Sequence, residues 1–256
     1  MKKKELKISI VTVCFNSGKT IEDTIKSVLK QKYTNYEYII IDGKSTDNTL
    51  DIVKKYEPKF KGKMKVISEK DKGLYDAMNK GIKLSSGDII GTINSDDILG
   101  DEYVFNKIVD NFDDSTEVVY GDVIYKDSTL TKSIRYYISG ERKGFSWCPA
   151  HPTMYIRKEV FDKVGYYNLK YKVGADYDMM TRLNKSNINF KYIKEYLVYM
   201  RLGGASNGLK GYLNGFKDAY TILKDNKIKF ALLITIKRSF HTINQYIIAK
   251  FKRNTD

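Results

Sequence analysis

The chain has 256 residues, of which 42% are hydrophobic, and its formal net charge is +14. This composition predicts one globular domain with appendages, and it excludes a disordered chain and, with two cysteines, a disulfide framework. No apolar run approaches the ~20 residues that cross a bilayer, so we expect a cytoplasmic protein whose charge suits an anionic partner.

The first hundred residues alternate between short apolar runs and amphipathic segments. Strands are predicted over residues 8–15, 38–41, 65–67 and 88–93. Helices are predicted over residues 21–29, 50–60 and 74–84, and Thr46 or Asp47 is expected to cap the second one. Alternating strands and helices with short connections predict a parallel sheet with helices on both faces.

The pattern changes after about residue 115. Short strands are predicted over residues 118–120, 123–125 and 153–156, and helices over residues 158–164 and 176–183. The last stretch, from about Leu209, is basic and predicted to be helical.

Each of the first four predicted strands ends in polar residues. The carboxyl ends of parallel strands share one edge, where α/β proteins bind ligands. The adjacent carboxylates Asp96 and Asp97 after the fourth strand would be costly to bury unless they are hydrogen-bonded or paired with a cation. Turn formation and helix capping explain any single loop, but four such loops on one edge favour a site for a nucleotide and a metal.

Five blocks of the first half carry a family resemblance. They are residues 9–16 (SIVTVCFN), 41–49 (IDGKSTDNT), 71–81 (DKGLYDAMNKG), 87–90 (GDII) and 94–97 (NSDD). In order and spacing they resemble the inverting family 2 glycosyltransferases. The resemblance implies an α/β GT-A-type nucleotide-binding fold, with a mixed, mainly parallel sheet between helices and a C-terminal helical extension.

The resemblance also implies a division of the chain. Residues 1–206 would be the catalytic domain, with a nucleotide-sugar half over about 1–115 and an acceptor half over about 116–206. Residues 207–256 would be the basic helical tail. The residues expected to bind the nucleotide sugar are Thr12, Phe15, Asn16, Asp42, Ser45, Asp71, Asn79, Asn94 and Asp96.

Particular roles follow from these positions in the family pattern. Asp42 would accept a hydrogen bond from the nucleobase, and Asp71 would lie close to the base and ribose. Asn94, Ser95 and Asp96 replace the family's Asp-x-Asp motif. A Mg²⁺ or Mn²⁺ ion would then be bound by Asp96 or Asp97, and the resemblance does not decide which is the direct ligand.

A segment of the second half, residues 174–183, resembles the motif that supplies the catalytic base. Its usual Glu is replaced by Ala175, which leaves Asp176 as the candidate base, while Asp178 is expected to face elsewhere. The structural alternative is that Asp176 caps the following helix. Both roles are compatible, because a cap also fixes a carboxylate.

Three further residues are candidates for the acceptor side. Trp147 is expected to stack on a sugar ring, and His151 to contact the acceptor or pack in the interior. Arg201 would meet a diphosphate or form a surface ion pair.

Together these features predict a metal-assisted inverting transferase. It would move a sugar from a nucleotide diphosphate sugar, by preference a UDP-sugar, to a hydroxyl of a carbohydrate or polyprenyl-linked acceptor in polysaccharide biosynthesis. The alternatives are a nucleotidyltransferase on a similar fold and a basic nucleic-acid-binding protein. Neither has a clear motif, and we expect no nucleic-acid partner. The sugar, the linkage and the oligomeric state stay open.

The tail is expected to hold the enzyme against the anionic inner face of a membrane. Leu233, Ile236, Phe240, Ile243, Ile247 and Phe251 follow helical spacing, whereas Arg238, His241, Gln245, Lys252 and Arg253 fall mostly on the opposite face. Such a helix suits anionic headgroups. The alternative is that the apolar stripe packs against the catalytic domain or a second copy.

Overall fold

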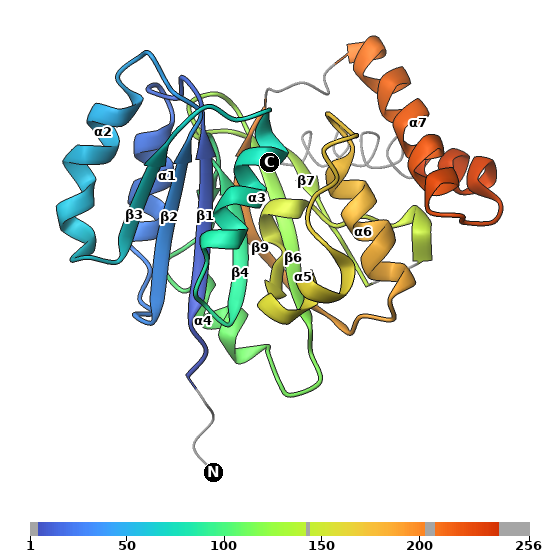
Figure 1. Cartoon of the computed structure of the whole chain (residues 1–256), viewed down its shortest axis with the longest axis horizontal. Coiled ribbons are helices and arrows are strands. Elements are labelled where there is room, and N and C mark those ends of the chain that lie inside the picture. Colours follow the sequence, from blue (N-terminus) through green and yellow to red (C-terminus); the bar gives the residue numbers. More distant parts are fainter. Residues whose placement is uncertain (1–4, 142–143, 203–207, 241–256) are drawn as a thin grey trace.

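A nine-stranded mixed sheet runs through the computed structural model, which describes residues 5–141, 144–202 and 208–240 (Figure 1). Along the sheet the strands lie in the order β3-β2-β1-β4-β8-β6-β9-β5, and β7 pairs with β6. The strands are β1 Ile8–Cys14, β2 Tyr36–Asp42, β3 Met64–Ser68, β4 Ile89–Asn94, β5 Ile98–Leu99, β6 Val118–Lys126, β7 Ser133–Tyr137, β8 Tyr155–Arg157 and β9 Phe190–Arg201.

The first four strands form the expected parallel unit. β1 pairs in parallel with β2 and β4, and β2 pairs in parallel with β3. The sheet then becomes mixed, because β8 is antiparallel to both β4 and β6, whereas β9 is parallel to β6. The predicted fold class is therefore confirmed.

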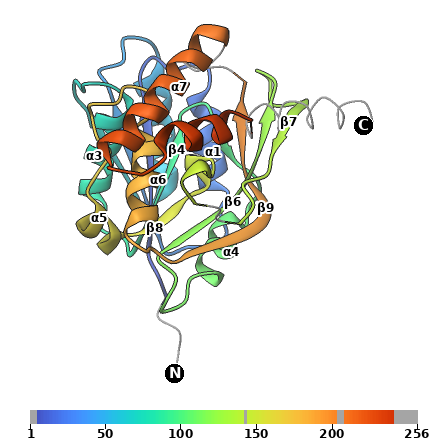
Figure 2. The same ribbon diagram turned by 90° about the vertical axis from the view of Figure 1, so that its right-hand side faces the viewer.

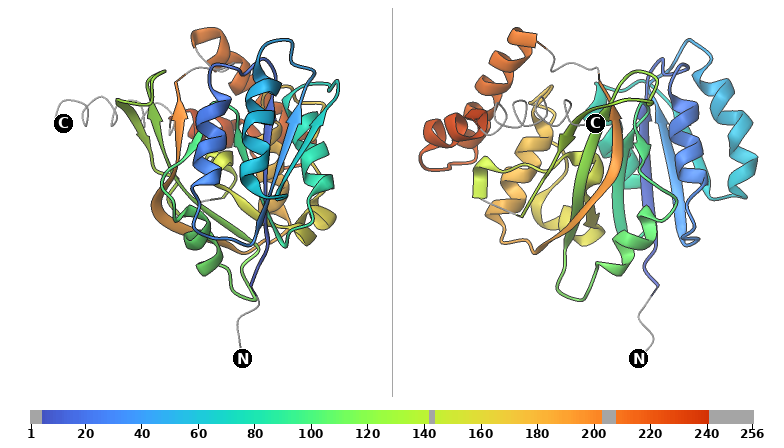
Figure 3. Two further views of the ribbon diagram at one scale, coloured as in Figure 1. Left: turned by 90° about the vertical axis from the view of Figure 1, so that its left-hand side faces the viewer. Right: turned by 180° about the vertical axis from the view of Figure 1, so that it is seen from behind.

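Helices cover both faces of the sheet (Figures 2 and 3). Side chains alternate along β1, so Ile8 and Ile10 belong to the core under α1, α2 and α4, whereas Val11 and Val13 belong to the core under α3, α5, α6 and α7. The helices are α1 Ile21–Leu29, α2 Thr49–Tyr56, α3 Leu74–Leu84, α4 Val104–Asp110, α5 Lys158–Val164, α6 Ala175–Lys185 and α7 Gly208–Asp225; short 3-10 helices span Glu57–Phe60, Gly144–Ser146 and His151–Thr153.

Several elements differ from the predictions. Residues 118–126 form one strand instead of two, and β5, β7, β9 and α4 were not predicted. The N-cap of α2 is Asn48, not Thr46 or Asp47, although Asp47 Oδ1 accepts a hydrogen bond from the Thr49 N–H at 3.0 Å.

The missed strand β9 contains an irregularity that hides its pattern. Tyr120 pairs with Tyr192, but Asp122 pairs with Tyr196, so β9 has extra residues around Glu195. A bulge of this kind changes which side chains face the core, and it interrupts the alternation by which a strand is recognised.

The chain after β9 is helical, as expected, in α7 and again over residues 231–240 (Figure 2). Leu233, Ile236 and Phe240 are exposed, but Arg238, predicted on the polar side, turns inward over the Tyr177 ring. The rest of the predicted stripe, from residue 241 on, and the 206/207 boundary lie outside the described residues. Within the described part no helix is long and apolar enough to span a bilayer.

Candidate active site

The ends of the parallel strands meet at one edge of the sheet, at the top of Figure 1. Cys14 is in register with Asp42, Val13 with Asn94, and Asp42 with Ser68. The polar loops that follow these strands are therefore neighbours, as the sequence predicted.

Two of the predicted donor-binding residues connect these loops. Asn16 Oδ1 accepts a hydrogen bond from the Thr46 N–H, and Ser45 Oγ accepts one from the Asn16 N–H, both at 2.8 Å. Asn16 has a φ of 49°, a left-handed conformation that Asn tolerates better than most residues. These contacts fix the loop on which Phe15 stands, with its ring 62% exposed.

The structure does not support the prediction that Asp42 reads the base. Asp42 is fully buried, and its carboxylate accepts hydrogen bonds from the Ser45 N–H and from the hydroxyls of Ser45 and Ser68. These donors satisfy its charge inside the protein, so the carboxylate stabilises the loop after β2. The sequence could not reveal this, because one of the donors, Ser68, comes from the neighbouring strand β3.

Gly43, Asp71 and Phe15 lie close together beside Asp42. A Cβ atom at Gly43 would lie 2.6 Å from Asp71 Oδ2 and 3.5 Å from a ring carbon of Phe15, so a larger residue would fit at this position only if Asp71 moved. Asp71 Oδ1 accepts the Gly73 N–H at 2.8 Å, which orients the half-buried carboxylate. An exposed aromatic ring beside a carboxylate suits a nucleobase, which stacks and donates hydrogen bonds.

Two other predicted donor contacts are structural. Thr12 is fully buried, and its hydroxyl accepts a hydrogen bond from Tyr38 at 3.0 Å. Asn79 is also buried, and its amide makes both bonds to the backbone of Tyr167, at 2.8 and 2.9 Å. Asn79 therefore ties α3 to the loop before α6 and does not face a ligand.

The adjacent carboxylates after β4 have different surroundings. Asp97 is 1% exposed and accepts a hydrogen bond from the Asn94 amide at 2.8 Å, while Asp96 is half-buried. Burial and the charge of Asp96 raise the pKa of Asp97 well above its ordinary value. Of the two residues that the sequence left open, Asp96 therefore has the better geometry for a metal.

The donor atoms here fit a cation that arrives with a diphosphate. In the part of the chain that the structure describes, no three His, Cys, Asp or Glu side chains form a metal-binding group. Mg²⁺ commonly needs only one or two carboxylates plus substrate phosphates. Asp96 offers one carboxylate, and the buried Asn94 Oδ1 has no hydrogen-bond partner.

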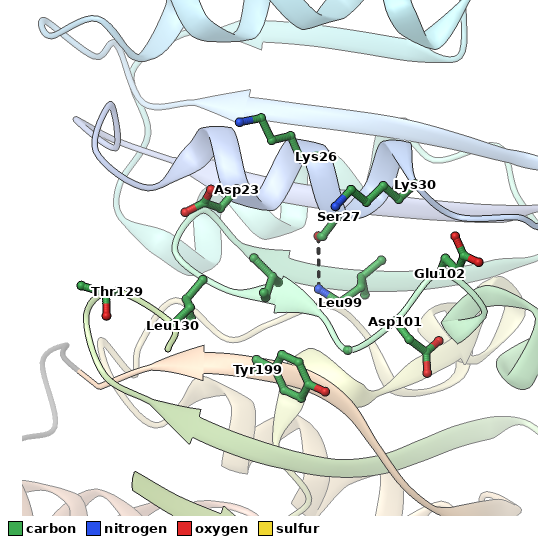
Figure 4. A pocket seen from close by; sticks show the side chains of 12 residues that line it. Asp23, Lys26, Ser27, Lys30, Leu99, Asp101, Glu102, Thr129, Leu130 and Tyr199 are labelled. Carbon is green, nitrogen blue, oxygen red and sulfur yellow. Dashed lines mark hydrogen bonds between the residues drawn. The ribbon is translucent and has the colours of Figure 1, made fainter. Parts of the chain in front are cut away.

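Arg201 supports the Asp96 loop from behind. Its guanidinium donates to the Asp96 carbonyl at 3.0 Å and to the Ser128 carbonyl, and it pairs with Asp23. The ion-pair alternative is therefore correct, and the diphosphate contact is not supported. Asp23 also lines a cavity of about 510 Å³ between α1, β5 and β9, and none of the predicted site residues lines it (Figure 4).

The candidate base lies in the first turn of α6. Gly174 is the N-cap, so the capping alternative for Asp176 is wrong, and the Asp176 side chain is 31% exposed. His151 Nδ1 lies 4.0 Å from Asp176 Oδ2, and His151 Nε2 lies 3.5 Å from the Asn94 amide nitrogen. His151 thus spans the space between the candidate base and the predicted metal motif.

Burial sets the protonation of this histidine. Desolvation lowers the pKa of His151, and the charges of Asp176 and Asp96, which act in the opposite direction, do not offset it. A neutral imidazole near Asp176 leaves the carboxylate without a strong ion pair. Tyr75 and Tyr167, which sequence reasoning missed, adjoin the same carboxylate, and their pKa values are raised mainly by burial.

Two neighbours of the site are interior residues. Trp147 is 4% exposed, and its indole N–H donates to the Ser139 carbonyl at 2.9 Å, so the prediction that it stacks on a sugar is wrong. Asp178 is 2% exposed and pairs with Arg182 at 2.9 Å, which agrees with the expectation that it faces elsewhere.

Solved structures resemble this fold. TarS of S. aureus (residues 1–349, in complex with UDP-GlcNAc) superposes with a TM-score of 0.68 at 18% identity, covering 85% of this chain and 65% of that one. The mannosyltransferase PcManGT of Pyrobaculum calidifontis (in complex with GDP-Man and Mn2+) gives a TM-score of 0.64 at 14% identity, covering 91% and 69%. The fold is that of the GT-A enzymes.

Sequence comparison gives the family. Residues 9–178 match the model of Glycosyl transferase family 2, and the chain belongs to this family. A PGL/p-HBAD biosynthesis glycosyltransferase of Mycobacterium bovis is 28% identical over 203 residues, which is 78% of each chain. An uncharacterized glycosyltransferase of Nostoc sp. is 26% identical over 216 residues, covering 79% of this chain and 66% of that one. The protein is therefore a glycosyltransferase.

Proposed function

We propose that this enzyme transfers a sugar, with inversion, from a nucleotide diphosphate sugar to a hydroxyl of a carbohydrate or polyprenyl-linked acceptor. The observation that carries the proposal is the position of Asp176. Its half-exposed carboxylate lies 4.0 Å from His151, which in turn lies 3.5 Å from Asn94 in the predicted metal motif. The proposed base and the proposed diphosphate site are thus separated by the imidazole ring of His151.

This arrangement suits a single displacement at the anomeric carbon. Asp176 would accept the proton of the acceptor hydroxyl as that oxygen attacks, a contribution of typically ~10²- to 10⁴-fold. A Mg²⁺ or Mn²⁺ ion bound at Asp96 would stabilise the negative charge on the leaving diphosphate. No covalent enzyme intermediate is required.

The donor is proposed to be a UDP-sugar. The exposed Phe15 ring and the half-buried Asp71 carboxylate lie close together, and a pyrimidine base stacks on aromatic rings and donates an N–H to carboxylates. The TarS complex with UDP-GlcNAc, on the same fold, supports this choice. Polysaccharide biosynthesis is the proposed setting.

The proposed location is the cytoplasmic face of a membrane. Leu232, Leu233, Ile236 and Phe240 are 37–66% exposed on one short helical segment. An exposed apolar stripe on a chain with a net charge of +14 suits an interfacial helix among anionic headgroups.

A donor panel tests the function. UDP-, GDP- and dTDP-sugars are compared by thermal unfolding with and without Mn²⁺. A donor at 100 times its dissociation constant should stabilise the protein by about 2.7 kcal/mol. Stabilisation by UDP-sugars only with Mn²⁺, and formation of the opposite anomer in the product, are expected. A product that retains the donor's anomeric configuration would overturn the inverting mechanism.

A further inference from the structure

The helical residues 231–240 present two different faces. Ala231 and Thr235 are buried, Ile234 packs against the core, and Arg238 is half-buried on the same face. The opposite face carries the exposed apolar side chains described above. The single arginine of this segment therefore points toward the catalytic domain, where a buried cation is costly unless it interacts with other groups.

Arg238 lies against the helix that carries the candidate base. Its guanidinium carbon is 4.0 Å from the ring centroid of Tyr177, within the range of a cation–π contact. Tyr177 is 2% exposed, and its hydroxyl donates to the Phe145 carbonyl at 2.7 Å. The ring is thus held between the arginine and the segment before Trp147.

Tyr177 is the next residue after Asp176. The Tyr177 N–H donates to Asp176 Oδ1 at 2.7 Å in the first turn of α6, so any movement of this residue moves the carboxylate. Burial lowers the pKa of Arg238. The net shift is nevertheless upward, because the pKa is raised by nearby ionisable groups, namely Cys148, Tyr177, Tyr137 and Asp176. Arg238 is therefore both a mechanical and an electrostatic neighbour of the candidate base.

We propose that Arg238 is a positioning residue of the transfer reaction, which holds Tyr177 and thereby orients Asp176 toward the acceptor. The proposal rests on the proposed role of Asp176. It makes residues 231–240 part of the catalytic unit, with one face for the active site and the other for a surface outside it.

Three variants test this role. Arg238→Met keeps the length and removes the charge, Arg238→Lys keeps the charge, and Lys237→Met removes a charge from the exposed neighbouring position. Misplacing a reacting group by ~1 Å can cost ~10²-fold. We therefore expect Arg238→Met to lower kcat by roughly 10- to 100-fold with the donor KM within two-fold of wild type. Arg238→Lys should recover most of kcat, and Lys237→Met should resemble wild type.

A second readout does not depend on turnover. Burial raises the pKa of Cys148 to about 11, and the charge of Arg238 limits this rise. The pH at which iodoacetamide alkylates Cys148, followed by peptide mass spectrometry, should therefore increase in Arg238→Met and not in Arg238→Lys or Lys237→Met. A merely structural role predicts a lower unfolding temperature of Arg238→Met without the fall in kcat.

The two failures are distinguishable. An active enzyme whose Arg238→Met variant keeps wild-type kcat, or whose Cys148 alkylation is unchanged, would overturn the role of Arg238 alone. An enzyme that transfers no sugar from any donor, yet shows the expected Cys148 pattern, would overturn the proposed function and, with it, the positioning role.

Discussion

Asp96 and Asp97 are neighbours in the chain but occupy different environments, which gives a direct test of the metal assignment. Asp96→Asn should abolish Mn²⁺-dependent donor binding, because it removes the half-exposed carboxylate. Asp97→Asn should bind nearly as well as wild type, because the side chain is buried and an Asn oxygen there can still accept the Asn94 amide. Calorimetric titration with a UDP-sugar, with and without Mn²⁺, measures both. Equal losses in the two variants would contradict the assignment.

Asp176→Asn should fold, bind donor and lose turnover. Gly174 caps α6, so the substitution removes no helix cap and stability should change little. Loss of a general base typically costs ~10²- to 10⁴-fold in kcat. Single-turnover kinetics with saturating donor give the comparison. A variant within a few-fold of wild type would remove Asp176 from the catalytic role.

Asp71→Asn should raise the donor KM and leave kcat nearly intact, since its proposed partner is the base and not the reacting carbon. Asp42→Ala should instead lower the unfolding temperature, because it leaves three partly buried donors of Ser45 and Ser68 without their acceptor. Steady-state kinetics and thermal unfolding of both variants separate the two effects. If Asp42→Ala raises the donor KM and Asp71→Asn lowers the unfolding temperature, Asp42 is the residue that contacts the nucleobase.

At the residue scale, the motifs of the sequence indicate Asp96 and Asp176, whose carboxylates are accessible and whose roles stay predictions. The sequence did not indicate the burial of Thr12, Asp42 and Trp147, because the packing of other elements around them decides it. Arg238 could not have been assigned, because only the packing of the tail brings it to Tyr177.

At the scale of single elements, β2 depends on one buried carboxylate. Glu37 is 4% exposed and accepts hydrogen bonds from Ser9 and from the N–H and hydroxyl of Ser86. Burial raises its pKa, but these bonds and Lys7 outweigh burial and bring the pKa to about 2. The charged form is therefore favoured in the folded state, and the strand loses stability when that charge is removed.

Glu37→Gln should lower the free energy of unfolding by about 3 kcal/mol at pH 7. Because the folded-state pKa is depressed, this stabilisation is complete above the ordinary Glu value and disappears as the pH falls through about 2. Urea unfolding of wild type and variant from pH 7 to pH 2 measures the difference. Glu57→Gln, at an exposed position outside this hydrogen-bond cluster, is the control, and a difference independent of pH would count against the assignment.

Elements with one clear period were predictable to the residue. The apolar spacing predicted residues 74–84 and 158–164, which are α3 and α5. β5 and α4 are short, and β9 changes phase at its bulge, so none of them has a pattern long enough to identify. The two strands are defined by their partners in the sheet and not by their own sequences.

At the scale of the whole molecule, the exposed apolar face should bind anionic vesicles. Wild type should float with phosphatidylglycerol vesicles at low salt, and the fraction bound should fall as salt rises. The double variant Leu233→Ser with Phe240→Ser should not float, but it should retain donor binding because both side chains are exposed. If the double variant floats as well as wild type, this face does not bind the vesicles.

The contact between Arg201 and the Asp96 loop has a consequence for how the enzyme is made. β5, directly after that loop, pairs with the end of β9, and Arg201 is the last residue of β9. The ribosome must therefore deliver more than a hundred further residues after Asp96 before the loop acquires its support. We therefore expect the nascent chain to gain nucleotide-sugar binding only late in synthesis. Chains stalled before residue 201 should bind no nucleotide sugar, although all the sequence blocks that predicted the donor site have already been synthesised.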